Sequence, residues 1–173
     1  YTGKRIEYLK PTFLRGQKCL ENISDETECY LIENNSKQTL WILGDSHTRS
    51  LALAGKEVAN TLGMNMKLFT AGATSFPPVG YYQKLIKGGS LRLGDFKIVE
   101  KELYKQIKVG DIILLSMRMP YHFGGTYYEY PTSSFVFIKK DGSFGSQENY
   151  FDNWIASVVN LANIAQKKGT KII

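Results

Sequence analysis

The chain has 173 residues, enough for one domain whose core needs no disulfide or metal to hold it. Hydrophobic residues make up 43% and charged residues 22%, as in an ordinary globular domain, and no apolar run is long enough to cross a bilayer. The 22 basic and 16 acidic residues give a net charge of +6, which suits an anionic surface or serves solubility alone. No nucleic-acid-binding motif is present, so we expect no nucleic-acid partner.

Residues 1–37 show no sustained helical or strand period, so we expect an irregular arm over a main domain of residues 38–173. Both cysteines, Cys19 and Cys29, lie in this arm. A pair so close in a polar segment favours a local disulfide in an oxidising compartment, with two unrelated free thiols as the alternative. A metal site would need more ligands than the sequence offers there. Because the chain stops inside an expected strand, we expect a segment of a longer protein whose carboxyl-terminal part is missing here.

Residues 40–50 (LWILGDSHTRS) carry the strongest local signal. The apolar run predicts a buried strand, Gly44 a sharp turn, and the residues after the turn a helix to about Leu62. Such a turn places the hydroxyl of Ser46 at the carboxyl end of the strand, near unpaired helix amides. Open α/β sheets bind their ligands there, and a nucleophilic serine can be activated there. Alternatively, Ser46 is simply an N-cap and Asp45 a turn former.

Two further strands are expected to end beside this turn. Residues 66–70 predict a strand that runs into a loop of small residues containing Gly72. Residues 112–117 read as a strand buried on both faces, which implies a parallel sheet covered by helices. Arg118 follows that strand and could hold an oxyanion or an acidic substrate, or merely anchor a loop.

The remaining pattern completes the fold class. Residues 95–108 and 148–168 have helical spacing, and residues 171–173 begin another strand. Residues 134–144 contain an Asp-Gly pair between apolar runs, which predicts a β-hairpin inserted into the strand-helix order. We therefore predict an α/β domain with a central parallel sheet, an irregular amino-terminal arm and a β-hairpin insertion.

The loop after Arg118 carries Tyr121 and His122 in an aromatic-rich stretch. Aromatic rings beside a polar site suit the faces of sugars, and equally they pack an insertion onto a domain. We name both residues as candidate substrate-binding residues, and His122 also as a weaker candidate for a base that approaches Ser46.

Three short blocks resemble the SGNH (GDSL-like) hydrolase superfamily. They are Gly44-Asp45-Ser46-His47, Pro77-Pro78 after the Gly72 loop, and Leu115-Ser116-Met117-Arg118. Within that superfamily the chain resembles the SGNH domain that follows the membrane acyltransferase-3 domain in bacterial surface-polysaccharide O-acyltransferases, and the cysteine pair before the first strand also fits. The resemblance implies a three-layer α/β/α, flavodoxin-like fold.

The resemblance also implies site roles. Ser46 would be the nucleophile, and the backbone amides of Ser46 and Gly72 would serve the oxyanion hole. The family's Gly-x-Asn-Asp block is absent, and Arg118 lies nearest to its place, so we include Arg118 in the hole. The family's catalytic Asp and His lie in an Asp-x-x-His block after the strand that begins at Lys171, so we expect the base beyond this chain and a structural role for His47.

By this resemblance we expect a serine-dependent O-acyltransferase that passes an acyl group, by preference acetyl, from a donor to a sugar hydroxyl of a cell-surface polysaccharide. A carbohydrate acetylesterase and a non-catalytic glycan-binding or assembly module are the alternatives. The resemblance implies no metal or other cofactor. It implies a membrane acyltransferase-3 domain in the same full-length protein and a periplasmic or extracytoplasmic location, at the bacterial inner membrane through a segment outside this chain.

Overall fold

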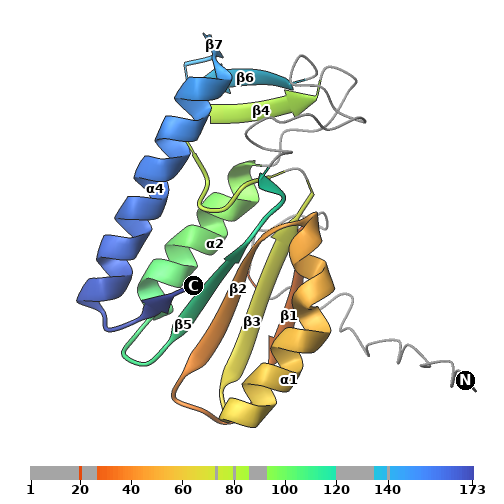
Figure 1. Cartoon of the computed structure of the whole chain (residues 1–173), viewed down its shortest axis with the longest axis vertical. Coiled ribbons are helices and arrows are strands. Elements are labelled where there is room, and N and C mark those ends of the chain that lie inside the picture. Colours follow the sequence, from red (N-terminus) through yellow and green to blue (C-terminus); the bar gives the residue numbers. More distant parts are fainter. Residues whose placement is uncertain are drawn as a thin grey trace, which may run out of the picture.

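The computed structural model describes residue 20 and residues 27–72, 74–79, 81–85, 93–119, 135–139 and 141–173. A five-stranded sheet with the order β1-β3-β2-β5-β8 forms its centre (Figure 1). Its strands are β1 (Thr27–Ile32), β2 (Thr39–Asp45), β3 (Asn65–Ala71), β5 (Ile112–Ser116) and β8 (Lys171–Ile172). The strands β3, β2, β5 and β8 are parallel, so their carboxyl ends share one edge of the sheet.

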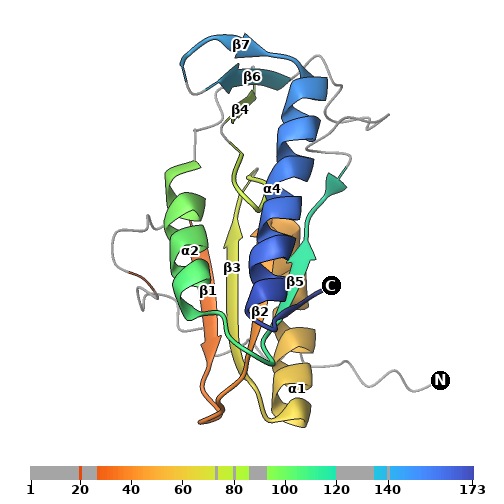
Figure 2. The same cartoon turned by 90° about the vertical axis from the view of Figure 1, so that its left-hand side faces the viewer.

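Helices cover both faces of this sheet, as the strand-helix order predicts. A short 3-10 helix, η1 (Ser46–Leu51), leads into α1 (Ala52–Leu62), which packs on one face. The helices α2 (Leu93–Gln106) and α4 (Gln147–Lys167) pack on the other face, where the larger core cluster lies (Figure 2). The three-layer α/β fold is therefore confirmed. In the described part of the chain, no helix combines the length and the apolar character of a membrane span.

The sheet is mixed: β3, β2, β5 and β8 form the expected parallel part, and one antiparallel strand is added at one edge. Residues 27–32, expected to be irregular, form β1, which pairs antiparallel with β3 from Thr27 opposite Ala71 to Ile32 opposite Met66. All residues of β1 except Thr27 are half-buried, because β1 is an edge strand. Cys29 packs against the core on the α2 side, whereas Tyr30 packs on the α1 side. β1 is thus an integral part of the sheet.

β5 is less buried than its apolar sequence predicts. Ile113 is fully buried, but its four companions in the strand are half-buried. The physical reason is that few elements cover β5. In the described part of the chain, α1 lies against β1, β2 and β3, and β8 pairs only with Ile112 and Ile113. The far half of β5, which leads to Arg118, therefore lies near solvent.

A smaller antiparallel sheet stands beyond the carboxyl edge of the main one (Figure 1). It consists of β4 (Tyr81–Leu85), β6 (Phe135–Lys139) and β7 (Phe144–Gly145) in the order β4-β6-β7. The predicted β-hairpin is confirmed as β6 and β7, and Gly142 in its turn has a φ of 83°, which favours glycine. The third strand, β4, was not expected from the sequence.

Candidate active site

The structure brings Ser46, Gly72 and Arg118 to one edge of the main sheet. Asp45, the last residue of β2, lies opposite Ala71 of β3, so Ser46 and Gly72 follow directly on neighbouring strands. On the other side of β2, Gly44 lies opposite Ser116 of β5, and Arg118 comes two residues later. The rule that ligands bind at the carboxyl ends of parallel strands therefore applies to all three predicted residues.

Ser46 is exposed at the start of η1. A 3-10 helix has three residues per turn, so side chains three apart lie on the same row. Asp45 and Thr48 form the buried row, at 1% and 0% exposure, whereas Ser46 and Arg49 are both exposed. The N-cap of η1 is Asp45, so the alternative that Ser46 is the N-cap is wrong. The turn leaves the Ser46 side chain accessible to a substrate.

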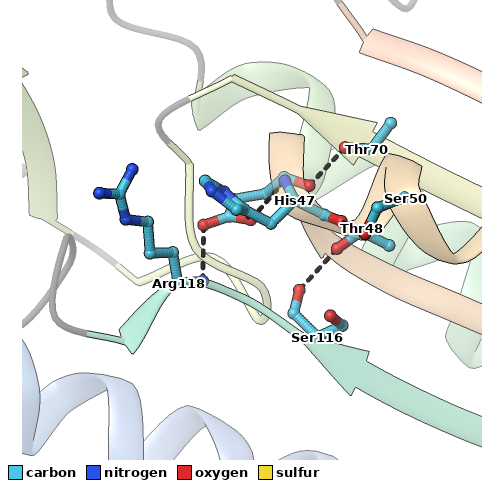
Figure 3. Close-up of polar contacts among 7 residues, drawn as sticks. His47, Thr48, Ser50, Thr70, Ser116 and Arg118 are labelled. Atoms are coloured by element: carbon cyan, nitrogen blue, oxygen red, sulfur yellow. Dashed lines mark hydrogen bonds and ion pairs between the residues drawn. The ribbon is translucent and has the colours of Figure 1, made fainter.

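The buried Asp45 holds the ends of all three strands together through hydrogen bonds with His47, Arg118 and Thr70, which Figure 3 labels. Its Oδ1 accepts the backbone N–H of His47 at 2.9 Å, and its Oδ2 accepts the backbone N–H of Arg118 at 2.8 Å. Its backbone carbonyl accepts a hydrogen bond from the Thr70 hydroxyl at 2.5 Å. Hydrogen bonds to a carboxylate are stronger than neutral ones and limit relative movement. Asp45 thus fixes the backbone of Arg118 relative to the turn that carries Ser46.

Gly44 is needed for close approach and does not make the turn, contrary to the expectation. It lies within β2, outside the residues with positive φ. A Cβ atom at this position would overlap the carbonyl oxygen of Ser116 and the hydroxyl of Thr48. That hydroxyl donates a 2.6 Å hydrogen bond to the same carbonyl (Figure 3). Gly44 therefore allows η1 to be fastened directly to β5.

The loop that follows Gly72 is fastened to α4. Residues 74–79 are buried, and the Trp154 Nε1–H donates to the carbonyl of Phe76 at 3.2 Å. The Ser75 and Tyr150 hydroxyls are hydrogen-bonded to each other. Burial raises the pKa of Tyr150 to about 12, so this side chain stays neutral at physiological pH. The helix therefore fixes the path of the chain just beyond Gly72.

The same part of α4 also supports the end of β5. Tyr150 and Trp154 form a small buried cluster with Val79, and Met117 packs against this cluster. Met117 immediately precedes Arg118. One helix face thus contacts the segments that carry two of the three candidate residues, Gly72 and Arg118. Both contacts lie far from Ser46 in sequence.

Two functional candidates at this edge, Arg49 in η1 and Glu28 in β1, were not predicted from the sequence. Arg49 lies on the same row of η1 as Ser46, and its guanidinium lies 3.2 Å from Oε1 of Glu28 in β1. The Tyr30 hydroxyl donates to Oε2 of the same carboxylate at 2.5 Å. The spacing of three between Ser46 and Arg49 was a usable signal once the turn was identified as 3-10. No sequence signal indicated that Glu28 approaches Arg49, because this contact depends on the unexpected strand β1.

His47 is the histidine nearest to Ser46 in the described residues. Its side chain is 54% exposed, and Nδ1 lies 3.5 Å from Oδ1 of Asp45. Its backbone N–H closes the turn through Asp45, and its carbonyl accepts the Ser50 hydroxyl at 2.7 Å. These backbone contacts serve the shape of η1.

Tyr121, His122 and Cys19 lie outside the described residues. Cys29 lies in β1, and its pairing with Cys19 stays a prediction. Over the ranges that the structure describes, no group of three His, Cys, Asp or Glu side chains is arranged to hold a metal ion.

The arrangement at the edge suits attack on an acyl group. An exposed hydroxyl stands at the end of a parallel strand, the chain after the next strand turns at Gly72, and Arg118 enters from the other side. Backbone N–H groups and a guanidinium in such positions can stabilise the negative charge that develops on a carbonyl oxygen.

Comparison with known proteins agrees with this geometry. The family model described as "SGNH domain (fused to AT3 domains)" matches residues 16–173. No curated protein matches the chain, and no solved structure does. The matched range contains the whole sheet, both edges and all the helices described above. The chain therefore belongs to the family of SGNH domains that are fused to AT3 domains.

Proposed function

We propose that this domain is a serine-dependent O-acyltransferase that transfers an acyl group, by preference acetyl, to a sugar hydroxyl of a cell-surface polysaccharide. Membership of the family makes the chain a module of the acyltransferase and esterase type. The observation that carries the finer proposal is the exposed Ser46 beside Gly72 and Arg118 at the carboxyl edge of the sheet.

In the proposed reaction the Ser46 hydroxyl attacks the carbonyl carbon of the acyl donor and gives its proton to a base. The backbone amides of Ser46 and Gly72, with Arg118, stabilise the resulting oxyanion. The bond to the donor's leaving group breaks, and that group leaves with the proton. A sugar hydroxyl then attacks acyl-Ser46 and loses its proton to the base. The bond between the acyl group and Ser46 breaks, and the base returns the proton to the Ser46 oxygen, so the products are the sugar ester and the free Ser46 hydroxyl.

We place the base in an Asp-x-x-His block that follows β8. Ile173 extends the β5–β8 ladder: its N–H donates to Ile113 at 2.8 Å, and its carbonyl accepts the N–H of Leu115 at 3.1 Å. β8 runs parallel to β5, so residues that continue in this direction approach the end of β5. Arg118 lies at that end. A histidine from such a continuation would reach the edge that carries Ser46.

The test is Ser46→Ala in the full-length protein, supplied with an acetyl donor and a polysaccharide acceptor. We expect acetyl transfer to fall by about 10⁴-fold or more, while the melting temperature stays unchanged. Labelling of Ser46 by a fluorophosphonate, located by mass spectrometry, should disappear in the same variant. Ser50→Ala is the matched control, because Ser50 is an exposed serine in the same turn.

Three outcomes decide between the alternatives. Loss of transfer in Ser46→Ala but not in Ser50→Ala supports the proposal. Release of free acetate without any acetylated acceptor identifies an acetylesterase instead. Full transfer by Ser46→Ala rejects the nucleophile and leaves a glycan-binding or assembly module.

We also propose a periplasmic location, an AT3 membrane domain in the same protein as partner, and a disulfide between Cys19 and Cys29. The fusion that names the family supports the membrane association. A disulfide would attach the segment before β1 to a strand of the main sheet, since Cys29 packs against the core. Alkylation of protein purified from the periplasm should modify both thiols after reduction and neither before it. Alkylation without reductant would reject the pairing.

A further inference from the structure

Arg49 stands next to Ser46 on the accessible side of η1. The two residues are three apart in a 3-10 helix, so their side chains project from the same row, and both are exposed. The Arg49 side chain is 53% exposed although it is ion-paired. A substrate that reaches the Ser46 hydroxyl therefore approaches the side of η1 from which Arg49 projects.

The guanidinium is held in a fixed place from β1. One Arg49 nitrogen lies 3.2 Å from Oε1 of Glu28, and the Tyr30 hydroxyl donates to Oε2 at 2.5 Å. Glu28 lies opposite Thr70 in the β1–β3 ladder, so its position is set by the sheet. An exposed ion pair adds little to stability, and the ladder already holds β1 in place. The contact nevertheless orients the planar fork of Arg49 and leaves its other donors toward solvent.

The charges around Ser46 favour an anion. Arg49 lies toward β1 and Arg118 follows β5, so they lie on opposite sides of β2, the strand that ends just before Ser46. Of the two carboxylates near this turn, Asp45 is 1% exposed and its oxygens accept backbone N–H groups. Glu28 is the carboxylate that remains near the surface. In the described part of this edge, two arginines, Arg49 and Arg118, thus accompany one carboxylate near the surface, Glu28.

We propose that Arg49 binds a carboxylate or phosphate group of the glycan that Ser46 acylates, and that Glu28 is the positioning residue for this arginine. The inference rests on the proposed function, because it names the substrate class of that same site as an acidic glycan. Guanidinium is suited to both anions, since its parallel N–H groups match two oxygens of either one.

The experiment measures binding in the absence of turnover. The protein with Ser46→Ala is titrated with three oligosaccharides of matched length: an oligoglucuronate, an oligo(glycerol phosphate) and a neutral glucose oligomer. We expect at least one anionic oligomer to bind more tightly than the neutral one. Adding Arg49→Gln should weaken that binding by about 10-fold or more and leave the neutral oligomer within about twofold. The arms separate a carboxylate ligand from a phosphate ligand.

Two further variants separate recognition from general electrostatics. Lys56→Gln removes an exposed cation from α1 and is the matched charge control, with less than about a twofold effect expected. Glu28→Gln removes a negative charge, so simple electrostatics predicts tighter binding of an anion. A positioning role predicts weaker binding, because the guanidinium loses its anchor. Tighter binding by Glu28→Gln would overturn the role of Glu28, and an equal effect of Lys56→Gln and Arg49→Gln would overturn that of Arg49.

A kinetic arm distinguishes this inference from the proposed function. In the protein with Ser46 intact, Arg49→Gln should raise KM for the acidic acceptor by about 10-fold more than it changes KM for a small neutral acetyl ester, whereas Lys56→Gln should leave both values unchanged. An equal loss with both substrates, or a lowered melting temperature that accounts for the loss, would assign Arg49 a structural role and contradict the inference. Failure of Ser46→Ala to reduce transfer would reject the nucleophile without changing the binding result.

Discussion

The main sheet has a buried aspartate at its amino edge, where the parallel strands begin, and another at its carboxyl edge, where they end. The two edges differ in how exposed the residues around the aspartate are. At the amino edge Asp111 is 0% exposed and accepts N–H groups from Thr39, Trp41 and Lys108. At the carboxyl edge Asp45 is 1% exposed and accepts N–H groups from His47 and Arg118. Both carboxylates join neighbouring segments through charge-assisted hydrogen bonds.

The difference lies in what surrounds each carboxylate. Asp111 is bound by a buried indole, by the backbone N–H at the start of β2 and by the backbone N–H of Lys108 just before β5, so its surroundings are closed. Asp45 is followed directly by the exposed Ser46. The two backbone amides that Asp45 binds belong to His47, whose side chain is exposed, and to Arg118, whose side chain is half-buried. A buried aspartate alone is therefore no sign of a catalytic site. Its position at the edge where parallel strands end is the informative feature.

Replacing one glycine by alanine at each edge should give the largest difference in the free energy of unfolding. Gly44→Ala places a methyl group on the backbone carbonyl of Ser116, which cannot move aside, so we expect a loss of about 3 kcal/mol or more in the free energy of unfolding. Gly110→Ala at the amino edge meets the flexible Gln38 side chain and a φ of 84°, and should cost about 1–2 kcal/mol. Urea unfolding measures both. Equal losses would contradict the close approach at Gly44.

Asparagine in place of each aspartate tests the comparison directly. Asp111→Asn and Asp45→Asn should each lower the free energy of unfolding by about 1–3 kcal/mol, because each loses a charged acceptor for buried N–H groups. Asp45→Asn alone should also lower ester turnover, by about 10-fold or more, since Arg118 and the turn lose their alignment. Urea unfolding and turnover of an acetyl ester are measured together. An equal effect of both variants on turnover would remove the distinction between the edges.

A matched pair of tryptophans gives a smaller effect. Trp154→Phe removes the hydrogen bond to Phe76 behind the Gly72 loop, and Trp41→Phe removes the 3.3 Å bond to Asp111. Each should cost about 1–2 kcal/mol, because a buried acceptor loses its donor. We expect reduced kcat in Trp154→Phe and unchanged kcat in Trp41→Phe. Unchanged kcat in Trp154→Phe would show that α4 supports the loop without affecting the reaction.

The smallest effect concerns pH at the amino edge. The Lys67 ammonium lies 5.0 Å from the Trp41 ring centre and donates to Gln106 at 2.6 Å. Burial lowers the pKa of Lys67 from its ordinary value of 10.5, with Glu33 the largest opposing influence. The folded state therefore releases this proton first, and its desolvation cost disappears as pH rises toward 10.5.

The matched variant is Lys67→Met, which has no such proton. Wild type should gain stability relative to Lys67→Met as pH rises through the window just below 10.5, by less than about 1 kcal/mol because the ammonium is only partly buried. Urea unfolding at several pH values measures this difference. A difference that stays constant with pH would contradict the assigned shift, and any effect on ester turnover would contradict the separation of the two edges.

The sequence predicted the elements whose signal is local. Strands at residues 40–43, 66–70 and 112–117 and the hairpin near residue 142 were found because apolar runs and turn residues mark them directly. β1 was missed because an edge strand of half-buried residues lacks a strong pattern, and β4 because its partner β6 lies about fifty residues away. The mixed character of the sheet could not be read without β1.

The candidate site divides in the same way. Ser46, Gly72 and Arg118 were identified from their places after expected strands, and the structure brings them together, while their catalytic roles stay predictions. The contacts of Asp45 and Glu28 depend on which residues of neighbouring strands lie opposite each other. Strand register is a property of the packed sheet, so no local pattern indicates it.

The three-residue period of η1 restricts how this edge can vary among related chains. One residue inserted between Asp45 and Thr48 would turn Thr48 out of the interior, detach it from Ser116 and carry Arg49 away from Glu28. The turn is therefore intolerant of length changes, whereas a substitution at position 28 in β1 leaves its geometry intact. Divergence in acceptor preference should accordingly arise through β1 and the connecting loops, with the length of residues 44–49 unaltered.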